Sequence, residues 1–280
     1  MYIKCWGSRG SIPVAGEEYN KYGGDTTCIQ IRAQSGETVI IDAGTGLRKL
    51  GLDLPSNINS NYHMLFTHTH WDHISGFPFF KPLQDSNVTL TIHNSRFYEL
   101  SVKEIIANIM ALPFFPITMK EMQANVIYQE SDQPTFTIGS LDIETIPLSH
   151  PGGGLGYRFS ENGRVFVFLT DNELTHPHPG GMAIKDYTLF CKDADFVFHD
   201  MEFTPEEYPS KKGWGHSSCT DVIELAINAN VKQLGLFHIN QERTDDAMDQ
   251  MVDLCQDIIR KKNSPMTCFG VAGGMEFTLL

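Results

Sequence analysis

The chain has 280 residues, with 34 acidic and 21 basic side chains, so its formal net charge is −13 with histidine counted neutral. Hydrophobic residues make up 41% of the chain and aromatic residues 11%, which excludes a disordered protein. The acidic balance argues against a long nucleic acid as partner, because such binding depends on Lys and Arg. We expect a single domain over residues 1–280 and no membrane-spanning segment, because no apolar run is long enough.

The expected compartment is the cytoplasm. The opening MYIKCWGSRGS has no apolar stretch after Lys4, so it does not resemble a secretory signal. No pair of cysteines has the C-x-x-C spacing of a zinc ribbon or a redox dithiol. We therefore expect reduced, mostly buried thiols at Cys5, Cys28, Cys191, Cys219, Cys255 and Cys268.

Short strands dominate the first two thirds of the chain. Apolar or alternating runs of strand length occupy residues 2–6, 27–33, 38–42 and 62–67, and later 126–129, 141–146, 155–160, 164–170 and 195–199. Between them, residues 95–122 have a helical pattern that LPFFP at 112–116 interrupts, because two prolines break a helix.

The last quarter alternates helix and strand. Ser218 and Asp221 have the spacing of a capping box and predict a helix that ends near Asn230. Asp245 and Asp246 begin a second helix, and basic residues at 260–262 end it, as the helix dipole favours. Its apolar stripe is expected in the core and consists of Met248, Met251, Val252, Cys255, Ile258 and Ile259.

The densest cluster of candidate metal-binding side chains follows the apolar run HMLFT. Three imidazoles and one carboxylate occur within six residues, at His68, His70, Asp72 and His73. Buried without a ligand, each would need a separate hydrogen-bond partner, so packing explains the cluster poorly. His68 and His70 alternate along an extended segment, while Asp72 and His73 follow around a turn. This arrangement suits two adjacent cations.

The H-x-H-x-D-H pattern resembles the signature of the metallo-β-lactamase superfamily of hydrolases. The family's other conserved positions are matched in order by Asp42 in VIIDAGTG, His150 in PLSHPGGG, Asp171 in VFVFLTDNE and His238 in LGLFHIN. The resemblance covers about residues 2–240. It implies an α/β fold of the αββα sandwich type, with two mixed β-sheets packed face to face and helices outside.

The resemblance also implies two divalent metal ions. One would be held by His68, His70 and His150, the other by Asp72, His73 and His238, and Asp171 would bridge them. Asp42 would orient the histidine-rich loop. Imidazole and carboxylate ligands without thiolate suit Zn²⁺, with Mn²⁺ and Fe²⁺ as alternatives. Ions about 3.5–4 Å apart would share a hydroxide that acts as nucleophile.

His216 in GWGHSSCTD points to one branch of the family. It is similar to the G-H-S/T motif of the phosphodiesterase branch, which includes RNase Z and cyclic-phosphate hydrolases, where the histidine protonates the departing alkoxide. His199 and Asp200 resemble that branch's H-E/D segment, in which the carboxylate orients the catalytic histidine. The resemblance therefore implies His216, Asp200 and the ligand Asp72 as catalytic residues.

The expected substrate is a small phosphodiester, above all a 3′,5′-cyclic nucleotide such as cAMP or cGMP. RNase Z has a long arm that clamps tRNA between the positions of His150 and Asp171, and here only strand-like sequence fills that interval. GSRGSIP, YGGDTTC and HPGGGLGYRF are similar to segments of cyclic nucleotide phosphodiesterases. Arg9 is either a further positive charge or a surface arginine. In the segment 112–116, Phe114 or Phe115 is a candidate base contact, with a lid or dimer contact as the alternative.

Several alternatives stay open. The same ligands serve RNase Z-like nucleases, lactonases and thioesterases, and also di-iron oxygen-binding domains. A scaffold that has lost its chemistry is disfavoured by the complete set of ligands. A homodimer is expected from the size and class of the protein.

Overall fold

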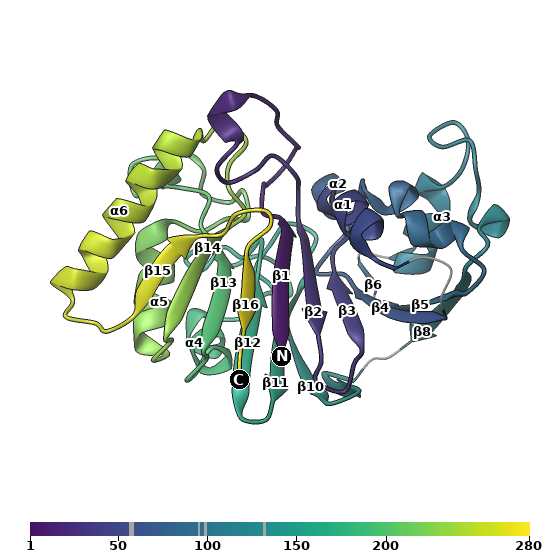
Figure 1. Cartoon of the computed structure of the whole chain (residues 1–280). Coiled ribbons are helices and arrows are strands. Elements are labelled where there is room, and N and C mark those ends of the chain that lie inside the picture. The colour runs from purple at the N-terminus through teal and green to yellow at the C-terminus, as the bar shows by residue number, and fades with distance from the viewer. Residues whose placement is uncertain (56–58, 95, 98–99, 131–132) are drawn as a thin grey trace.

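Two seven-stranded mixed sheets form the body of the molecule (Figure 1). The computed structural model describes residues 1–55, 59–94, 96–97, 100–130 and 133–280. The first sheet runs in the order β16 (Glu276–Thr278), β1 (Tyr2–Gly7), β2 (Cys28–Arg32), β3 (Thr38–Ile41), β4 (Ser60–Leu65), β5 (Val88–Asn94) and β8 (Asn125–Glu130). The second runs in the order β15 (Thr267–Gly270), β14 (Gln233–Phe237), β13 (Phe196–Asp200), β12 (Arg164–Leu169), β11 (Leu155–Glu161), β10 (Leu141–Pro147) and β9 (Thr135–Ile138).

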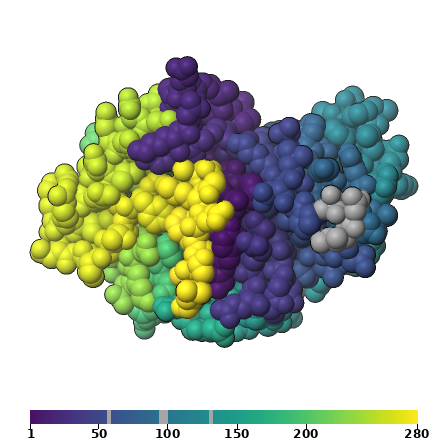
Figure 2. Space-filling model, viewed as in Figure 1, coloured from purple at the N-terminus to yellow at the C-terminus, as the bar shows by residue number. Residues whose placement is uncertain are grey.

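An apolar layer joins the inner faces of the two sheets. Alternate residues of a strand point to one face, so Ile29 and Ile31 of β2 meet a layer that includes Phe166 and Phe168 of β12. Met1 and Leu279 belong to the same cluster, because β1 and β16 pair antiparallel. Figure 2 shows the C-terminal segment in yellow lying against the purple N-terminal strand.

Helices cover both outer faces. On the first sheet, α1 (Gly46–Asp53) and α3 (Val102–Ile109) contribute to one apolar cluster with β4 and β5. On the second, α4 (Ile184–Phe190), α5 (Cys219–Asn228) and α6 (Asp245–Lys261) contribute to another (Figure 1). Met248 and Met251 of α6 are buried there, as predicted. The layers confirm the αββα sandwich.

Several local predictions need correction. β5, β9 and β16 were not predicted. Of the segment 95–122, residues 95, 98 and 99 lie outside the described residues. Among the described ones, the α-helix is limited to α3, after the short strands β6 (Arg96–Phe97) and β7 (Leu100–Ser101), and a 3₁₀ helix follows at Met119–Glu121. Ser101 and Glu104 form a capping box that sets the start of α3. Ser218 does precede α5, but its hydroxyl donates to the Asp221 carboxylate and caps no backbone N–H group.

Two global expectations can be compared with the described residues. All six cysteines are free and buried, as predicted for reduced thiols. Within the described part of the chain, no helix combines the length and the apolar character needed to cross a bilayer.

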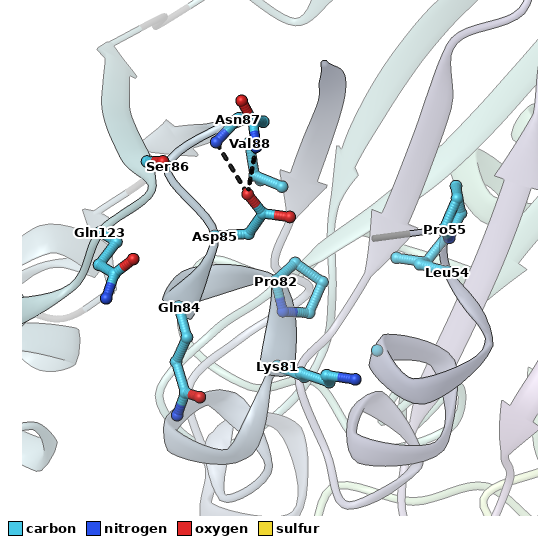
Figure 3. Close-up of a pocket in the computed structure, with 11 residues that line it drawn as sticks. Leu54, Pro55, Lys81, Pro82, Gln84, Asp85, Ser86, Asn87, Val88 and Gln123 are labelled. Carbon is cyan, nitrogen blue, oxygen red and sulfur yellow. Dashed lines mark hydrogen bonds between the residues drawn. The ribbon is translucent and has the colours of Figure 1, made fainter. Parts of the chain in front are cut away.

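The parallel strands of both sheets have their carboxyl ends at a common edge of the sandwich. β3, β4 and β5 are parallel neighbours in the first sheet, and β12, β13 and β14 in the second. The opposite edge of the first sheet holds a hollow lined by Leu54, Lys81, Asp85 and Val88 among others (Figure 3). No histidine or cysteine is among the described residues that line this hollow.

Substitution of Phe198 in β13 tests how much the apolar layer between the sheets contributes to stability. The Phe198 side chain is fully buried, and its ring centroid lies 5.0 Å from that of Phe166 and 5.5 Å from that of Phe277. We expect Phe198→Ala to lower the free energy of unfolding by about 3–5 kcal/mol, because a large cavity is left. Urea denaturation followed by circular dichroism measures this. Leu189→Ala, at an exposed position of α4, is the control, and an equal loss there would contradict the assignment.

Candidate metal centre

Three side chains of the site lie just beyond strand ends in left-handed backbone. Asp42 follows β3, Asp171 follows β12 and His238 follows β14, and their φ angles are 61°, 53° and 55°. Residues other than glycine seldom adopt this left-handed region, and such strain is concentrated at functional sites. The strain turns each side chain out of its strand toward the space where the sheets meet.

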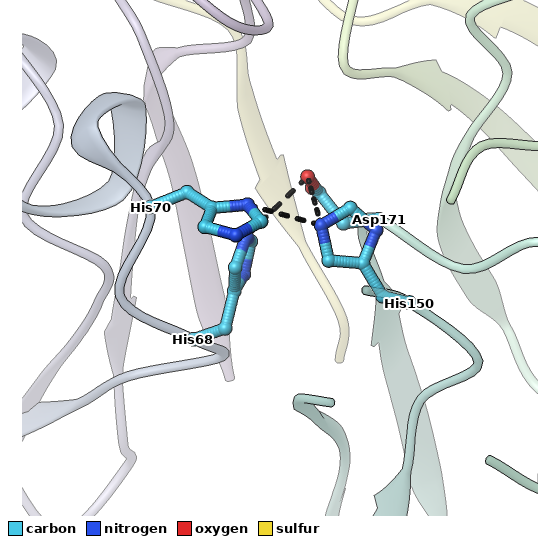
Figure 4. A group of neighbouring side chains, drawn as sticks. All are labelled: His68, His70, His150 and Asp171. Atoms are coloured by element: carbon cyan, nitrogen blue, oxygen red, sulfur yellow. Dashed lines mark hydrogen bonds and ion pairs between the residues drawn. The ribbon is translucent and has the colours of Figure 1, made fainter. Parts of the chain in front are cut away.

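Four side chains form the first group of donors (Figure 4). His68 and His70 come from the loop after β4, and His150 and Asp171 from loops of the second sheet. His150 Nε2 lies 3.1 Å from His70 Nδ1, and Asp171 Oδ2 lies 3.5 Å from His68 Nε2 and 3.7 Å from His150 Nε2. The ligand atoms of the group all lie within 4.8 Å of one another. His70 is exposed, whereas the other three are buried, so the group opens toward solvent on the His70 side.

A second group shares Asp171 with the first. Asp72 and His73 belong to the short helix α2 (Trp71–Ile74), and His238 follows β14. Asp72 Oδ2 lies 3.2 Å from Nε2 of both His73 and His238, and Asp171 lies 3.3 Å from the same two nitrogens. All four side chains are buried. The structure thus brings the seven predicted ligands together as two groups joined by Asp171.

The far nitrogen of each of three imidazoles contacts a protein oxygen. His73 Nδ1 lies 2.8 Å from Asp42 Oδ2, His150 Nδ1 lies 2.9 Å from the Gly215 carbonyl, and His238 Nδ1 lies 3.1 Å from Glu202 Oε2. Each contact directs the ring's other nitrogen, Nε2, into the cluster. Partners of this kind fix ring orientation and tautomer in metal sites. Asp42 has the orienting position expected for it, and it also accepts from the Thr67 N–H and hydroxyl groups.

The donors fit divalent cations. Nε2 of His68 and Nε2 of His73 are buried without a hydrogen-bond partner, which is costly unless a ligand occupies the space they face. Burial lowers the pKa of His68 well below its usual range and that of His150 to about 4, so both rings are neutral, the form that binds metals. Imidazole and carboxylate donors without thiolate match Zn²⁺, Mn²⁺ and Fe²⁺.

The two carboxylates supply the negative charge of the cluster. Burial by itself raises the pKa of Asp171, but His238 and His73 outweigh it and hold the pKa well below its usual range. The same balance lowers the pKa of Asp72. Both side chains are therefore ionised and can act as metal ligands.

His216 lies beside both groups. Its ring stacks on His238 at a centroid distance of 4.6 Å and lies 5.2 Å from the ring of His150. Nδ1 is 3.6 Å from Asp200 Oδ2, and Nε2 is 3.4 Å from Glu202 Oε2. Burial alone lowers the pKa of His216, but the carboxylates of Glu202 and Asp200 outweigh it and raise the pKa to about 9. A protonated imidazole is thus held at the cluster.

Asp200 also holds the backbone around this histidine. It is fully buried and accepts from the N–H groups of Asn172, Glu202 and Ser217. The Ser217 contact fixes the residue after His216. Asp200 therefore lies at an ion-pair distance from His216 and in addition positions the loop that carries it, while its orienting role in catalysis stays a prediction.

Sequence reasoning missed Glu202 and the loop at residues 10–11. Glu202 is buried between His238 and His216, and Asn240 Nδ2 donates to its second oxygen. The alternation in FVFHDMEF was a possible signal, since Glu202 lies two residues after Asp200. The Ser11 N–H donates to Asp72 Oδ2, and a Cβ at Gly10 would lie 2.3 Å from the His238 ring. Gly10 is therefore required by this close approach.

Arg9 is not a surface arginine, and its role as a further positive charge stays a prediction. It is fully buried, and its guanidinium donates to the carbonyls of Gly23, Asn240 and Arg243. Those bonds tie the loop that contains Gly10 and Ser11 to the segment after His238. The hydrogen bonds of its guanidinium therefore stabilise the arrangement of these loops.

In the segment 112–116, the side chains divide between solvent and protein. Phe114 is exposed, while Phe115 is half-buried, and its ring centroid lies 5.7 Å from that of Phe79. A base contact by either ring stays a prediction.

Known proteins resemble this chain over most of its length. The family described as Beta-lactamase superfamily domain matches residues 37–239. Ribonuclease Z of Geobacillus kaustophilus is 22% identical over 263 residues, which cover 81% of this chain and 86% of that protein. A diphosphatase from the PhnP family has the same fold, with a TM-score of 0.69, 16% identity, and coverage of 100% of this chain and 98% of that one. Unliganded yeast PDE1 gives a TM-score of 0.67, 12% identity and coverage of 99% of both chains.

The fold and the donor cluster define a metal-dependent hydrolase that acts on ester bonds. The chain belongs to the metallo-β-lactamase superfamily.

Asp42 provides a test of the cluster that leaves every candidate ligand in place. We expect Asp42→Asn to weaken zinc binding by about 10–100-fold, because His73 loses a charged partner at Nδ1. Competition with a chromophoric chelator measures the affinity, and elemental analysis gives the metal content. Asp53→Asn at the end of α1 is the control. Unchanged affinity in Asp42→Asn would show that Asp42 does not support a metal ligand.

Proposed function

We propose that the protein is a dinuclear metal-dependent phosphodiesterase. In this proposal His68, His70 and His150 hold one ion, Asp72, His73 and His238 hold the other, and Asp171 bridges them. Zn²⁺ is the preferred ion, with Mn²⁺ and Fe²⁺ as alternatives. The observation that carries the proposal is the convergence of these donors into two groups sharing Asp171, directly beside His216.

The roles of the residues follow from their positions. When bound, two divalent ions supply Lewis-acid activation of water and neutralise phosphate charge. Asp72 and Asp171 hold negative charge at the centre, and Asp42 and Glu202 keep Nε2 of His73 and Nε2 of His238 turned inward. His216 holds a proton between two carboxylates and donates it to the leaving alkoxide oxygen.

The preferred substrate is a small phosphodiester, most specifically a 3′,5′-cyclic nucleotide. Between His150 and Asp171 the chain forms the hairpin of β11 and β12, which Asn162 and Gly163 close with φ angles of 52° and 76°. This interval therefore holds no long arm for gripping RNA. The net charge of −13 further disfavours a polyanion.

A second candidate is cleavage of RNA. The observation in its favour is that ribonuclease Z of Geobacillus kaustophilus is matched over 81% of this chain. A short hairpin in place of an arm is compatible with RNA only if another surface binds it.

Three further properties belong to the proposal. Met1 and Leu279 share the inter-sheet core, which supports one domain over residues 1–280. Free thiols support a cytoplasmic location. A homodimer stays a prediction.

A panel of substrates tests the function. Protein loaded with Zn²⁺, Mn²⁺ or Fe²⁺ is assayed with cAMP, cGMP, 2′,3′-cyclic nucleotides, a linear dinucleotide, a tRNA precursor, a lactone and a thioester. We expect the 3′,5′-cyclic nucleotides to be the best substrates. Cleavage of the tRNA precursor alone would establish the second candidate, and preference for the lactone or thioester would overturn both. Visible absorption from bound iron without hydrolysis would indicate an oxygen-binding domain.

The acid role is tested by His216→Ala. We expect turnover of the cyclic nucleotide to fall by about 10²–10⁴-fold, because the alkoxide leaves unprotonated. Metal content, measured by elemental analysis, should stay at the wild-type level, since His216 is not among the proposed ligands. His63→Ala, a histidine of β4 outside the cluster, is the matched control. Wild-type turnover in His216→Ala would remove this residue from the mechanism.

A further inference from the structure

A buried carboxylate two residues beyond Asp171 has no part in the proposed chemistry. Glu173 is 1% exposed. Its Oε1 accepts hydrogen bonds from the Tyr208 hydroxyl and the Gly213 N–H group, both at 2.8 Å. Its Oε2 accepts from the Gly215 N–H group and from His178 Nε2, also at 2.8 Å. Four donors thus surround one carboxylate.

Three of the four donors belong to residues 208–215, which we term the clasp segment. The clasp segment ends at the residue before His216, and its irregular backbone includes Gly213 and Gly215 at φ angles of 88° and 94°. Two backbone N–H groups of this loop are directed at a single buried charge. Hydrogen bonds to an ionised acceptor are about twice as strong as neutral ones, so Glu173 holds the loop firmly.

The clasp segment also lies against the metal centre. The Gly215 carbonyl is 2.9 Å from His150 Nδ1, and a Cβ on Gly215 would lie 2.2 Å from the same nitrogen. The Glu173 N–H group donates to the Ser149 carbonyl at 2.8 Å, next to His150. Glu173 therefore connects the loop after Asp171, the approach to His150 and the approach to His216.

Both oxygens of Glu173 face donors, two of them backbone N–H groups. Because the backbone N–H groups cannot reverse their polarity, the site requires an acceptor at both oxygens.

We propose that Glu173 is a positioning residue that fixes the clasp segment and thereby places the His216 imidazole at the leaving group. The inference rests on the proposed function, in which His216 is the acid. It predicts a defect confined to the step that needs this acid, whereas a merely structural role would reduce the active fraction for every substrate alike.

Glu173→Gln is the decisive variant. Glutamine keeps the size of the side chain but presents one amide NH₂ group, which in either orientation faces the N–H of Gly213 or of Gly215. Two substrates of the metal-loaded protein are compared, with metal in excess. The leaving group of the cyclic nucleotide is a ribose alkoxide, which needs the acid. The leaving group of bis-p-nitrophenyl phosphate is a stable phenolate, which does not.

We expect kcat for the cyclic nucleotide to fall at least about tenfold in Glu173→Gln, and kcat for bis-p-nitrophenyl phosphate by less than about threefold. KM should change little for either substrate. His216→Ala should show the same selectivity, and the double variant should lose little beyond His216→Ala, because both act on one step. Tyr208→Phe removes one donor of four and should give a smaller, equally selective loss.

The control is Glu206→Gln, the same change at an exposed glutamate near the clasp segment, which should match the wild type. An equal fall of kcat on both substrates in Glu173→Gln, or a rise of KM with kcat unchanged, would overturn the positioning role. Failure of the wild type on both phosphodiesters would instead reject the proposed function. If His216→Ala is selective and Glu173→Gln is not, the function stands and the inference on Glu173 is wrong.

Discussion

The structure is organised around the burial of imidazoles and carboxylates that face one another across a small space. Asp171 lies within 3.3–3.7 Å of nitrogens from four histidines, and two of those nitrogens, Nε2 of His68 and Nε2 of His73, have no hydrogen-bond partner among the described residues. Such polar groups are expensive to bury unless paired charges or cations satisfy them. The cluster therefore demands a rigid frame that holds each ring from behind, and Asp42, Glu202 and the Gly215 carbonyl provide it.

The sandwich supplies the rigidity that this arrangement needs. Aromatic residues fill the layer between the sheets, and helices close both outer faces, so the strand ends cannot shift independently. Because parallel strands of both sheets end at one edge, residues far apart in the chain reach a common site. Left-handed backbone at Asp42, Asp171 and His238 is tolerated there because the surrounding packing over-determines it.

The carboxylates around His216 add a proton donor to the two groups of candidate metal ligands. A neutral imidazole stacked on another histidine would be a poor acid. Burial alone would lower the pKa of His216, but the carboxylates of Glu202 and Asp200 raise it and favour the protonated ring. Glu202 contacts both this ring and His238, so the proposed acid and a proposed ligand share one negative group. Arg9 is fully buried, and its guanidinium donates hydrogen bonds to backbone carbonyls such as that of Gly23.

The sequence by itself determined most of the strands and the cluster at residues 68–73, and its resemblance to a known family implied the sandwich and the distant polar residues of the site. Strand-length apolar runs and the H-x-H-x-D-H spacing each lie within a short stretch of chain, so they can be recognised from the sequence alone. Only the tertiary structure decided which oxygen orients which imidazole, that Glu202 and Glu173 belong near the centre, and that Arg9 is buried. Those contacts join residues of different loops, and loops leave no periodic pattern from which a partner can be read. The helical pattern predicted over 95–122, with its interruption at 112–116, is realised as an α-helix only in α3, because the strand pairing of β6 with β7 and the Ser101 cap set its start.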